Sequence, residues 1–428
     1  MSKLQWLLSR LRKMLWVRVS LFALAGVAAA ALASLTSRFF PGSLPFDISA
    51  DAIDSLLSII ASSMLAVTTF SVGALTSAYG SATSNGTARA TQLLTQDRVV
   101  QNSLATFVGS FLFSIVGLIA LKVSFYGPEG RAVLFIVSIA VVFLIVLALL
   151  RWINQLTRLG RVSDTVERIE TEARDSMDAR LRLPFLGGAP LPEDSADRPG
   201  AATEIRSPGV GYLNFIETAR LSQLAQDAGL EIDIHVLPGA FLYADTLLAR
   251  VRPGPDAPAS QPVALPEPLA GTICEAFSIA ALRSYDQDPR FGLVVLTEVA
   301  LRALSPAVND PGTGIDVIGR QTRLLTHWAA EWDAACTLRP DYPRLRLPGL
   351  RYDDLFEDAF NLIGRDGAGQ IDVMLRLVKS LMALSRIGPE ASRDAARAQL
   401  RVALSRAEAA LPSADDRRRL AEAVAGFA

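Results

Sequence analysis

The sequence predicts an α-helical membrane domain with four transmembrane helices plus a cytoplasmic α/β and mainly helical C-terminal domain. Half of the residues are hydrophobic and the mean hydropathy is +0.31, which is too apolar for an ordinary soluble protein. Almost all long uncharged runs lie before Arg151, whereas the remainder intersperses charged and apolar residues. These apolar runs make the lipid bilayer the expected partner. The net charge of −1 gives no sign of the basic face that nucleic-acid binding needs, so we expect no nucleic acid as a partner.

Four segments are long enough to cross a bilayer as helices: Trp16–Thr36, Asp51–Ala78, Ser103–Phe125 and Ala132–Leu150. They define a four-span transmembrane domain at residues 1–160. Basic residues gather before the first span and after the fourth, at Lys3, Arg10, Arg12, Lys13, Arg18, Arg151, Arg158, Arg161 and Arg168. Because cytoplasmic flanks carry an excess of Lys and Arg, we expect both the N- and C-termini in the cytoplasm.

Beyond residue 160 the composition predicts four segments. These are a charged helix and linker (161–208), a small cytoplasmic α/β unit (209–252), a Pro-rich linker (253–268) and a mainly helical cytoplasmic domain (269–428). In the α/β unit, "GYLNF", "LEIDIHVL" and "FLYADTLLARV" are typical of strands, and "IETARLSQLAQDAG" has helical period with Gly229 as its C-cap. The segment "GTICEAFSIAALRSY" predicts a helix in the last domain.

The segment "SPAVNDPGTG" predicts a rigid corner between two helices. Ser305, Asn309 and Asp310 are good helix-capping residues, and two prolines restrict the backbone between them. The alternative is a polar site, in which Asn309 and Asp310 supply oxygens to a cation or polar ligand together with Asp286 and Asp288 of "YDQDP". Acids beside proline are common in turns, so the sequence favours the corner.

The segment "SYDQDPRFGLVVLTEVALRALSPAVNDPGTGIDVI", with "GYLNFIETARLSQLAQDAG" and the four-span N-terminus, resembles the family of predicted bacterial membrane proteins catalogued as domain-of-unknown-function family 2254. The resemblance covers essentially the whole chain, and "ALSPAVNDP" is its most specific part. It implies a multi-pass protein of the bacterial inner (plasma) membrane with a cytoplasmic C-terminal part. It implies no activity and no functional residues.

The chain shows no signature of catalysis. Cys274 and Cys336 have no metal-like spacing, and His235 and His327 stand apart from other candidate ligands or bases. There is no Ser elbow, no HExxH motif and no P-loop, because "IGRDGAGQ" lacks the Lys and Ser or Thr that hold phosphate. We therefore expect no enzyme activity, no metal site and no cofactor.

The second span carries one face of small and hydroxylated residues. Steps of three and four align Ser55, Ser58, Ser62, Ala66, Thr69, Gly73 and Thr76. The opposite side carries Leu56, Ile60, Val67, Phe70 and Ala74, which suits lipid or neighbouring helices. A stripe of this kind serves helix packing or lines a polar path. The third span has a similar stripe that suits packing, at Ser103, Thr106, Ser110, Ser114 and Gly117, and the fourth span is apolar throughout and suits lipid.

Asp47, Asp51 and Asp54 extend the stripe of the second span to the outer surface. Acids at a mouth concentrate cations, and hydroxyl oxygens partly replace the water around them. One four-helix chain does not enclose such a path, whereas several copies around an axis do. The sequence thus favours a homo-oligomeric, cation-preferring ion channel or pore for monovalent cations, assembled or gated by its cytoplasmic domain. The alternative is a non-conducting membrane-anchored scaffold or sensor whose cytoplasmic domain binds a partner or small ligand.

Overall fold

The computed structural model describes residues 15–39, 49–85, 87, 89, 97–123, 126, 128–158, 161–192, 202–254 and 265–425. The chain divides into two compact units. We call Trp6–Thr165 the membrane unit and Val166–Ala428 the C-terminal unit. Asp47 of the predicted outer mouth lies outside the described residues.

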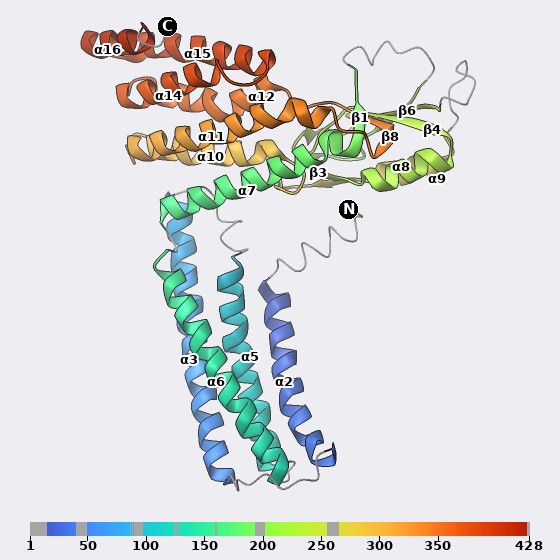
Figure 1. The fold of residues 1–428 in the computed structure, drawn as a ribbon, viewed down its shortest axis with the longest axis vertical. Coiled ribbons are helices and arrows are strands. Elements are labelled where there is room, and N and C mark those ends of the chain that lie inside the picture. The colour runs from blue at the N-terminus through green and yellow to red at the C-terminus, as the bar shows by residue number, and fades with distance from the viewer. Residues whose placement is uncertain are drawn as a thin grey trace. The chain divides into compact units, whose positions relative to one another are not determined.

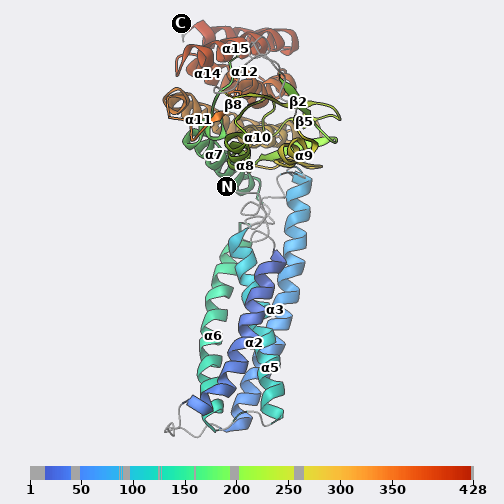
Figure 2. The same cartoon turned by 90° about the vertical axis from the view of Figure 1, so that its right-hand side faces the viewer.

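The membrane unit is a bundle of four helices that run side by side (Figures 1 and 2): α2 (Leu15–Phe39), α3 (Ala50–Asn85), α5 (Arg98–Lys122) and α6 (Pro128–Leu156). Helix α5 contacts each of the other three. Within the described residues, three helices (α3, α5 and α6) are long and apolar enough to cross a membrane, and α2 contributes a shorter apolar stretch, Val17–Ala29. The protein is therefore a multi-pass membrane protein, whereas a fourth crossing through α2 stays a prediction.

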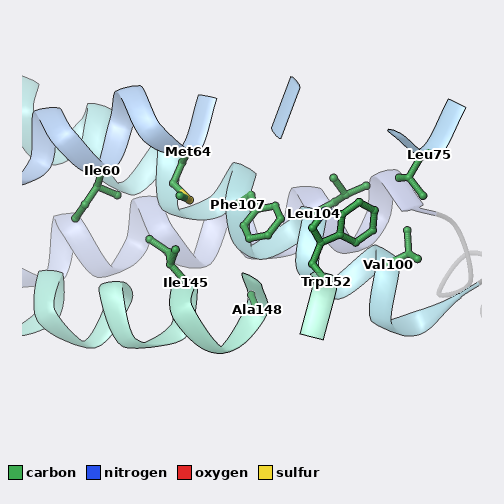
Figure 3. Close-up of a cluster of buried hydrophobic side chains, with 9 residues drawn as sticks. All are labelled: Ile60, Met64, Leu75, Val100, Leu104, Phe107, Ile145, Ala148 and Trp152. Carbon is green, nitrogen blue, oxygen red and sulfur yellow. The ribbon is translucent and has the colours of Figure 1, made fainter. Parts of the chain in front are cut away.

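Apolar side chains from three helices form the core of the bundle. Figure 3 shows Met64 of α3, Leu104 and Phe107 of α5 and Trp152 of α6 in one buried cluster. Phe107 has no exposed surface and Trp152 has 1%. Between helices in lipid, close van der Waals packing of such large side chains is a main source of association, because lipid and protein interior are equally apolar.

The C-terminal unit contains two sheets. The five-stranded sheet has the order β1-β8-β4-β6-β2, and its strands are β1 (Gly188–Pro190), β8 (Tyr342–Leu347), β4 (Leu230–Ile234), β6 (Leu247–Pro253) and β2 (Thr203–Arg206). Strands β1, β8 and β4 are parallel, and β6 and β2 continue the sheet antiparallel. The three-stranded antiparallel sheet has the order β5-β3-β7, with β5 (Phe241–Leu242), β3 (Gly211–Ile216) and β7 (Phe277–Ala280).

Helices make up most of the C-terminal unit (Figure 1). Helices α8 (Thr218–Asp227) and α9 (Glu267–Glu275) lie next to the strands, and α8 packs on β4 and β8. The others are α7 (Val162–Arg182), the 3-10 turn η1 (Pro184–Gly187), α10 (Pro289–Leu304), α11 (Pro311–Cys336), α12 (Tyr352–Phe356), the π-helical turn η3 (Glu357–Asn361), α13 (Leu362–Asp366), α14 (Ile371–Leu384), α15 (Glu390–Ala410) and α16 (Ala414–Ala425).

The predicted division of the C-terminal part is wrong in two places. The segment 209–252 does not close as a separate α/β unit, because β8 pairs with β4 and β7 pairs with β3 from beyond the Pro-rich linker. The segment 161–208 is not only helix and linker, since it holds η1, β1 and β2. Strands pair across any distance along the chain, and local composition does not reveal such pairing.

Two predicted elements also differ in kind. The segment "GTICEAFSIAALRSY" is not one helix, because α9 ends at Glu275 and the chain continues as β7. The predicted strand "FLYADTLLARV" is broken into β5 and β6 by a turn at Asp245, whose φ is 73°. The helix over 218–227 with Gly229 after it is confirmed, as Gly229 has a φ of 64°.

Candidate functional site

The small-residue stripe of α3 faces away from the other helices of its own chain. All seven predicted positions are exposed: Ser55, Ser58, Ser62, Ala66, Thr69, Gly73 and Thr76. The buried side of α3 is apolar instead, with Ile53, Leu57, Ile60 and Met64 at 5% exposure or less. Phe70, predicted on the opposite side, is itself 67% exposed. The stripe therefore contributes nothing to the packing of a single chain.

Three hydroxyl groups of the stripe donate to the backbone of their own helix. Ser62 Oγ donates to the carbonyl oxygen of Ser58 at 2.9 Å, Thr69 Oγ1 to that of Leu65 at 3.0 Å, and Thr76 Oγ1 to that of Val72 at 2.9 Å. Each hydroxyl thus has its proton directed inward, and its lone pairs stay available on the outer side of the helix. Because the hydroxyl protons are already bonded within the helix, the outer surface presents oxygen acceptors to a cation.

Asp51 and Asp54 lie at the start of the same helix. Asp51 is exposed and Asp54 is half-buried. Ser49 caps this end, because its hydroxyl oxygen accepts from the backbone N–H of Ala52 at 3.3 Å. The two carboxylates are therefore left to interact with the positive end of the helix dipole and with ions in solution.

The matching stripe of α5 is buried except at Thr106, which is half-buried and donates its hydroxyl to the carbonyl of Asn102 at 2.8 Å. Ser103, Ser110, Ser114 and Gly117 lie inside the bundle, and Ser103 Oγ donates to the carbonyl oxygen of Ala148 at 3.4 Å. On the same helix, a Cβ added at Gly109 would lie 3.0 Å from the carbonyl oxygen of Phe22 on α2. The small residues of α5 let neighbouring backbones approach closely, as membrane helices do.

Asp97 is a buried polar residue of the bundle that the sequence analysis did not single out. It caps α5 by accepting from the backbone N–H groups of Val99 at 2.7 Å and Val100 at 3.2 Å. Its other oxygen accepts from Gln155 Nε2 of α6 at 2.6 Å. Its position directly before an apolar run is a helix-start signal. With three donors on it, this carboxylate ties α5 to α6.

In the C-terminal unit, the motif "YDQDP" forms the centre of a buried polar cluster. Asp288 is 1% exposed and accepts from Arg283 Nε at 2.5 Å, from Arg283 Nη2 at 3.2 Å and from the backbone N–H of Arg290 at 3.1 Å. Gly239 packs directly on this carboxylate, and its φ of 97° suits glycine. Burial raises the pKa of Asp288, and the charges of Arg283, Arg290 and Arg180 oppose that rise.

Side chains from two other elements fix the same loop. Gln287 uses both ends of its amide on the backbone of Ile216, accepting from its N–H at 2.9 Å and donating to its carbonyl at 3.3 Å. Asn214 Nδ2 of β3 donates to the carbonyl of Leu282 at 2.9 Å, and Arg180 Nη2 of α7 donates to that of Gln287 at 2.7 Å. Burial lowers the pKa of Arg180 to about 10. The motifs "GYLNF" and "YDQDP", distant in sequence, thus meet in one structural cluster.

The corner at "SPAVNDP" is a helix junction. Asn309 has a left-handed φ of 51°, and Asp310 begins α11 by accepting from Thr313 N at 3.0 Å and Thr313 Oγ1 at 2.6 Å. These hydrogen bonds lower the pKa of Asp310. The backbone N–H of Asp310 donates to the carbonyl of Ala303 at 2.8 Å, which closes the end of α10. Asp310 therefore has structural partners, and the backbone N–H of Asn309 donates to the carbonyl of Ser305 at 2.8 Å.

The four residues of the predicted cytoplasmic polar site do not come together. Asp286 and Asp288 precede the first residue of α10, whereas Asn309 and Asp310 follow its last. The sixteen residues of α10 separate the two pairs by roughly 24 Å at the rise of an α-helix. Within the described residues, no group of three His, Cys, Asp or Glu side chains could hold a metal ion.

The sequence profile of the predicted membrane protein family DUF2254 matches residues 12–383. The chain belongs to this family. This DUF2254 protein is 29% identical over 193 residues to the uncharacterized proteins Mb1321c of Mycobacterium bovis and Rv1290c of Mycobacterium tuberculosis. The match covers 42% of this chain and 34% of each relative, so it spans about a third of the relatives' length. No solved structure matches the chain.

Proposed function

We propose that this DUF2254 protein is a homo-oligomeric, cation-preferring channel or pore of the bacterial inner membrane, with both termini in the cytoplasm. Helix α3 lines the path in this proposal, and the C-terminal unit assembles or gates it. The observation that supports it most is the exposure of all seven stripe residues of α3 in the single chain. Copies arranged around an axis would bring these stripes to the centre of the assembly.

The chemistry of the stripe suits monovalent cations. Its hydroxyl oxygens direct lone pairs outward, and Asp51 and Asp54 add negative charge at one end. Oxygens lining a path replace part of the water that a cation gives up, and a ring of carboxylates raises the local cation concentration.

The second candidate is a non-conducting scaffold or sensor, in which the stripe only packs copies together. Large apolar side chains flank the stripe on the exposed side of α3, including Ile59 at 63%, Leu65 at 54% and Val72 at 50%. Small residues between larger ones allow close helix approach, so the same surface also fits a dry contact between copies. The two functions differ in whether ions pass.

Ion flux into liposomes separates the candidates. Ser62→Leu should reduce cation flux at every salt concentration, because it removes an oxygen and narrows the path. The matched control is Ser63→Leu, the same change at another exposed position about 100° around the helix, which should leave flux nearly unchanged. Asp51→Asn with Asp54→Asn should reduce flux mainly at low salt, since salt screens their field.

Two results would contradict the channel. A monomeric mass in mild detergent would remove the basis for a central path. An intact oligomer without flux for any monovalent cation, across pH and voltage, would leave only the scaffold. Under the scaffold hypothesis, Ser62→Leu should break the oligomer and the two aspartate substitutions should have no effect on it.

A further inference from the structure

One face of the five-stranded sheet carries charged side chains on four of its strands. The cross-strand register places opposite charges next to each other in one row: Glu204 of β2, Arg250 of β6, Asp233 of β4 and Arg346 of β8. The opposite face is apolar and buried, at 5% exposure or less for Ile205, Ile232, Val251 and Leu345. The apolar face supplies the core packing of this sheet, so the charged face is not needed for it.

Arginines outnumber acids on the charged face. The described strands place eight charged side chains there, five of them arginines: Arg206, Arg250, Arg252, Arg344, Arg346, Glu204, Glu231 and Asp233. Two of the acids have an arginine in the middle of the sheet. Asp233 accepts from Arg252 Nε at 3.0 Å. Glu231 accepts from Arg346 Nη1 at 2.9 Å and Nη2 at 3.3 Å. At the β2 edge, Glu204 is the one acid of the described strands left for Arg206 and Arg250.

Glu204 divides its two oxygens between these guanidinium groups. Its Oε2 accepts from Arg206 Nη2 at 2.6 Å, and its Oε1 accepts from Arg250 Nη2 at 3.3 Å and Nε at 3.4 Å. Charge-assisted hydrogen bonds are usually about 2.7–2.9 Å long, so Arg250 is held only weakly. Arg206 also lies 3.6 Å from the carboxylate of Asp245, which is 79% exposed. With 46% of Arg206 and 23% of Arg250 exposed, both groups are open to a ligand from solution.

The charge of Arg250 acts on His235, the residue after β4. Burial lowers the pKa of His235, and the charge of Arg250 lowers it further. The Nε2 atom of His235 is buried and has no hydrogen-bond partner among the described residues. Buried polar atoms are nearly always hydrogen-bonded, so this nitrogen lacks its usual partner. The neighbourhood of Arg250 therefore combines positive charge with an unused polar atom.

We propose that Arg206 and Arg250 bind the phosphate group of a small anionic ligand at the β2 edge of the charged face. A guanidinium fork matches the oxygens of phosphate, and two arginines together balance a phosphate dianion. A phosphate has enough oxygens for both forks, whereas the single carboxylate of Glu204 reaches Arg250 only at long distance. Inorganic phosphate and phosphate monoesters share this chemistry. The site goes beyond the proposed channel, because binding requires no conduction.

Glu204 competes with this ligand for the same guanidinium groups. Its hydrogen bond with Arg206 lowers the pKa of Glu204, so the carboxylate stays ionised at neutral pH. The ligand must therefore displace a negative charge from Arg250. Removing the charge of Glu204 should strengthen binding, which is opposite to the effect of removing either arginine.

Calorimetric titration of the full chain in detergent, at low salt, measures the affinity for two probes, inorganic phosphate and glycerol 3-phosphate. Arg250→Met should weaken binding about tenfold, because one charge-assisted fork is lost. Glu204→Gln should strengthen binding severalfold. The matched control is Arg397→Met on α15, which should leave the affinity unchanged. Arg397 is also exposed and donates to a carboxylate, that of Asp394, at 2.9 Å.

Tighter binding of glycerol 3-phosphate than of inorganic phosphate would assign the site to a monoester, and the reverse order would assign it to free phosphate. Absence of binding for both probes would overturn the proposal. Equal losses in Arg250→Met and Arg397→Met would also overturn it, since they would show general attraction of anions. A folding defect cannot raise affinity, so unchanged or weaker binding in Glu204→Gln would contradict the competition at this site. Ion flux through the same preparations tests the channel separately, so either proposal can fail alone.

Discussion

Two helices of the C-terminal unit begin with the same dipeptide, Asp-Pro, in different surroundings. Asp288 starts α10 inside the protein, where it binds Arg283 and lies against Gly239. Asp310 starts α11 at the surface, where its only hydrogen-bond partner among the described side chains is Thr313. In both cases the carboxylate accepts from the first turn and proline follows at the first helical position.

The difference shows that the Asp-Pro motif determines the local geometry of a helix start, whereas the surrounding residues determine how much the aspartate contributes to the free energy of unfolding. A surface cap exchanges water for one or two backbone donors and contributes about 1 kcal/mol. A buried carboxylate that also neutralises guanidinium groups cannot be removed without leaving those charges in a medium of low dielectric constant. The same residue in the same motif should therefore differ severalfold in what it contributes.

Asp288→Ala should cause the largest loss, about 3–5 kcal/mol of the free energy of unfolding, because Arg283 and the buried Arg180 lose their carboxylate. Chemical unfolding followed by the fluorescence of Trp328 and Trp332, which stack 4.6 Å apart in the C-terminal unit, measures it. Asp288→Asn keeps the cap and should cost less. A loss below 1 kcal/mol for Asp288→Ala would show that the buried aspartate contributes no more to stability than the surface one.

Gly239→Ala should come second, at about 2–3 kcal/mol, since its Cβ would overlap the Asp288 carboxylate at a strained backbone angle. The matched control is Gly229→Ala, which has a φ of 64° and open space around its Cβ, and which should cost only about 1 kcal/mol. In the Asp288→Ala background the cost of Gly239→Ala should fall toward that of the control, because the overlap is gone. Additive costs would show that the two residues act independently.

Asp310→Ala should have the smallest effect, about 1 kcal/mol through the lost cap. Hydrogen bonds from Thr313 hold the pKa of Asp310 below its ordinary value of 3.8 in the folded protein. A lowered pKa means that this contribution is fully present above pH 3.8 and is lost as the pH falls through the lowered value. The difference in the free energy of unfolding between the wild type and Asp310→Ala should therefore stay constant above pH 3.8 and shrink as the pH falls through the lowered pKa. Identical pH dependence of the wild type and Asp310→Ala would contradict the cap.

The two small-residue stripes mark how far the sequence predicts the candidate site. The spacing of Ser55 to Thr76 on α3 and of Ser103 to Gly117 on α5 correctly aligned each set on one helical face, because side-chain direction follows from the helix period. The spacing does not reveal which face the rest of the chain covers. Packing between the helices, in which Met64 and Phe107 take part, leaves the α3 stripe outside and most of the α5 stripe inside.

The same limit applies to the C-terminal unit. The helix at 218–227 and the strand at 230–234 were predictable from apolar period and from Gly229. The placement of β8 was not, because a parallel strand that joins β4 from more than a hundred residues away leaves no local signal. Asn214 and Gln287 are likewise far apart in the sequence, so their joint role in fixing the loop before α10 could not be predicted.

The close approach of α2 and α5 determines the order in which the helices of the bundle can pack. A Cβ at Gly26 would lie 2.7 Å from the carbonyl oxygen of Gly109, so the first helix fits against the third at a glycine from each. During translation, α3 is synthesised after α2 and before α5. The close packing of α2 on α5 therefore forms only after some eighty more residues have been synthesised. Assembly of these two helices can therefore begin only when α5 has been synthesised.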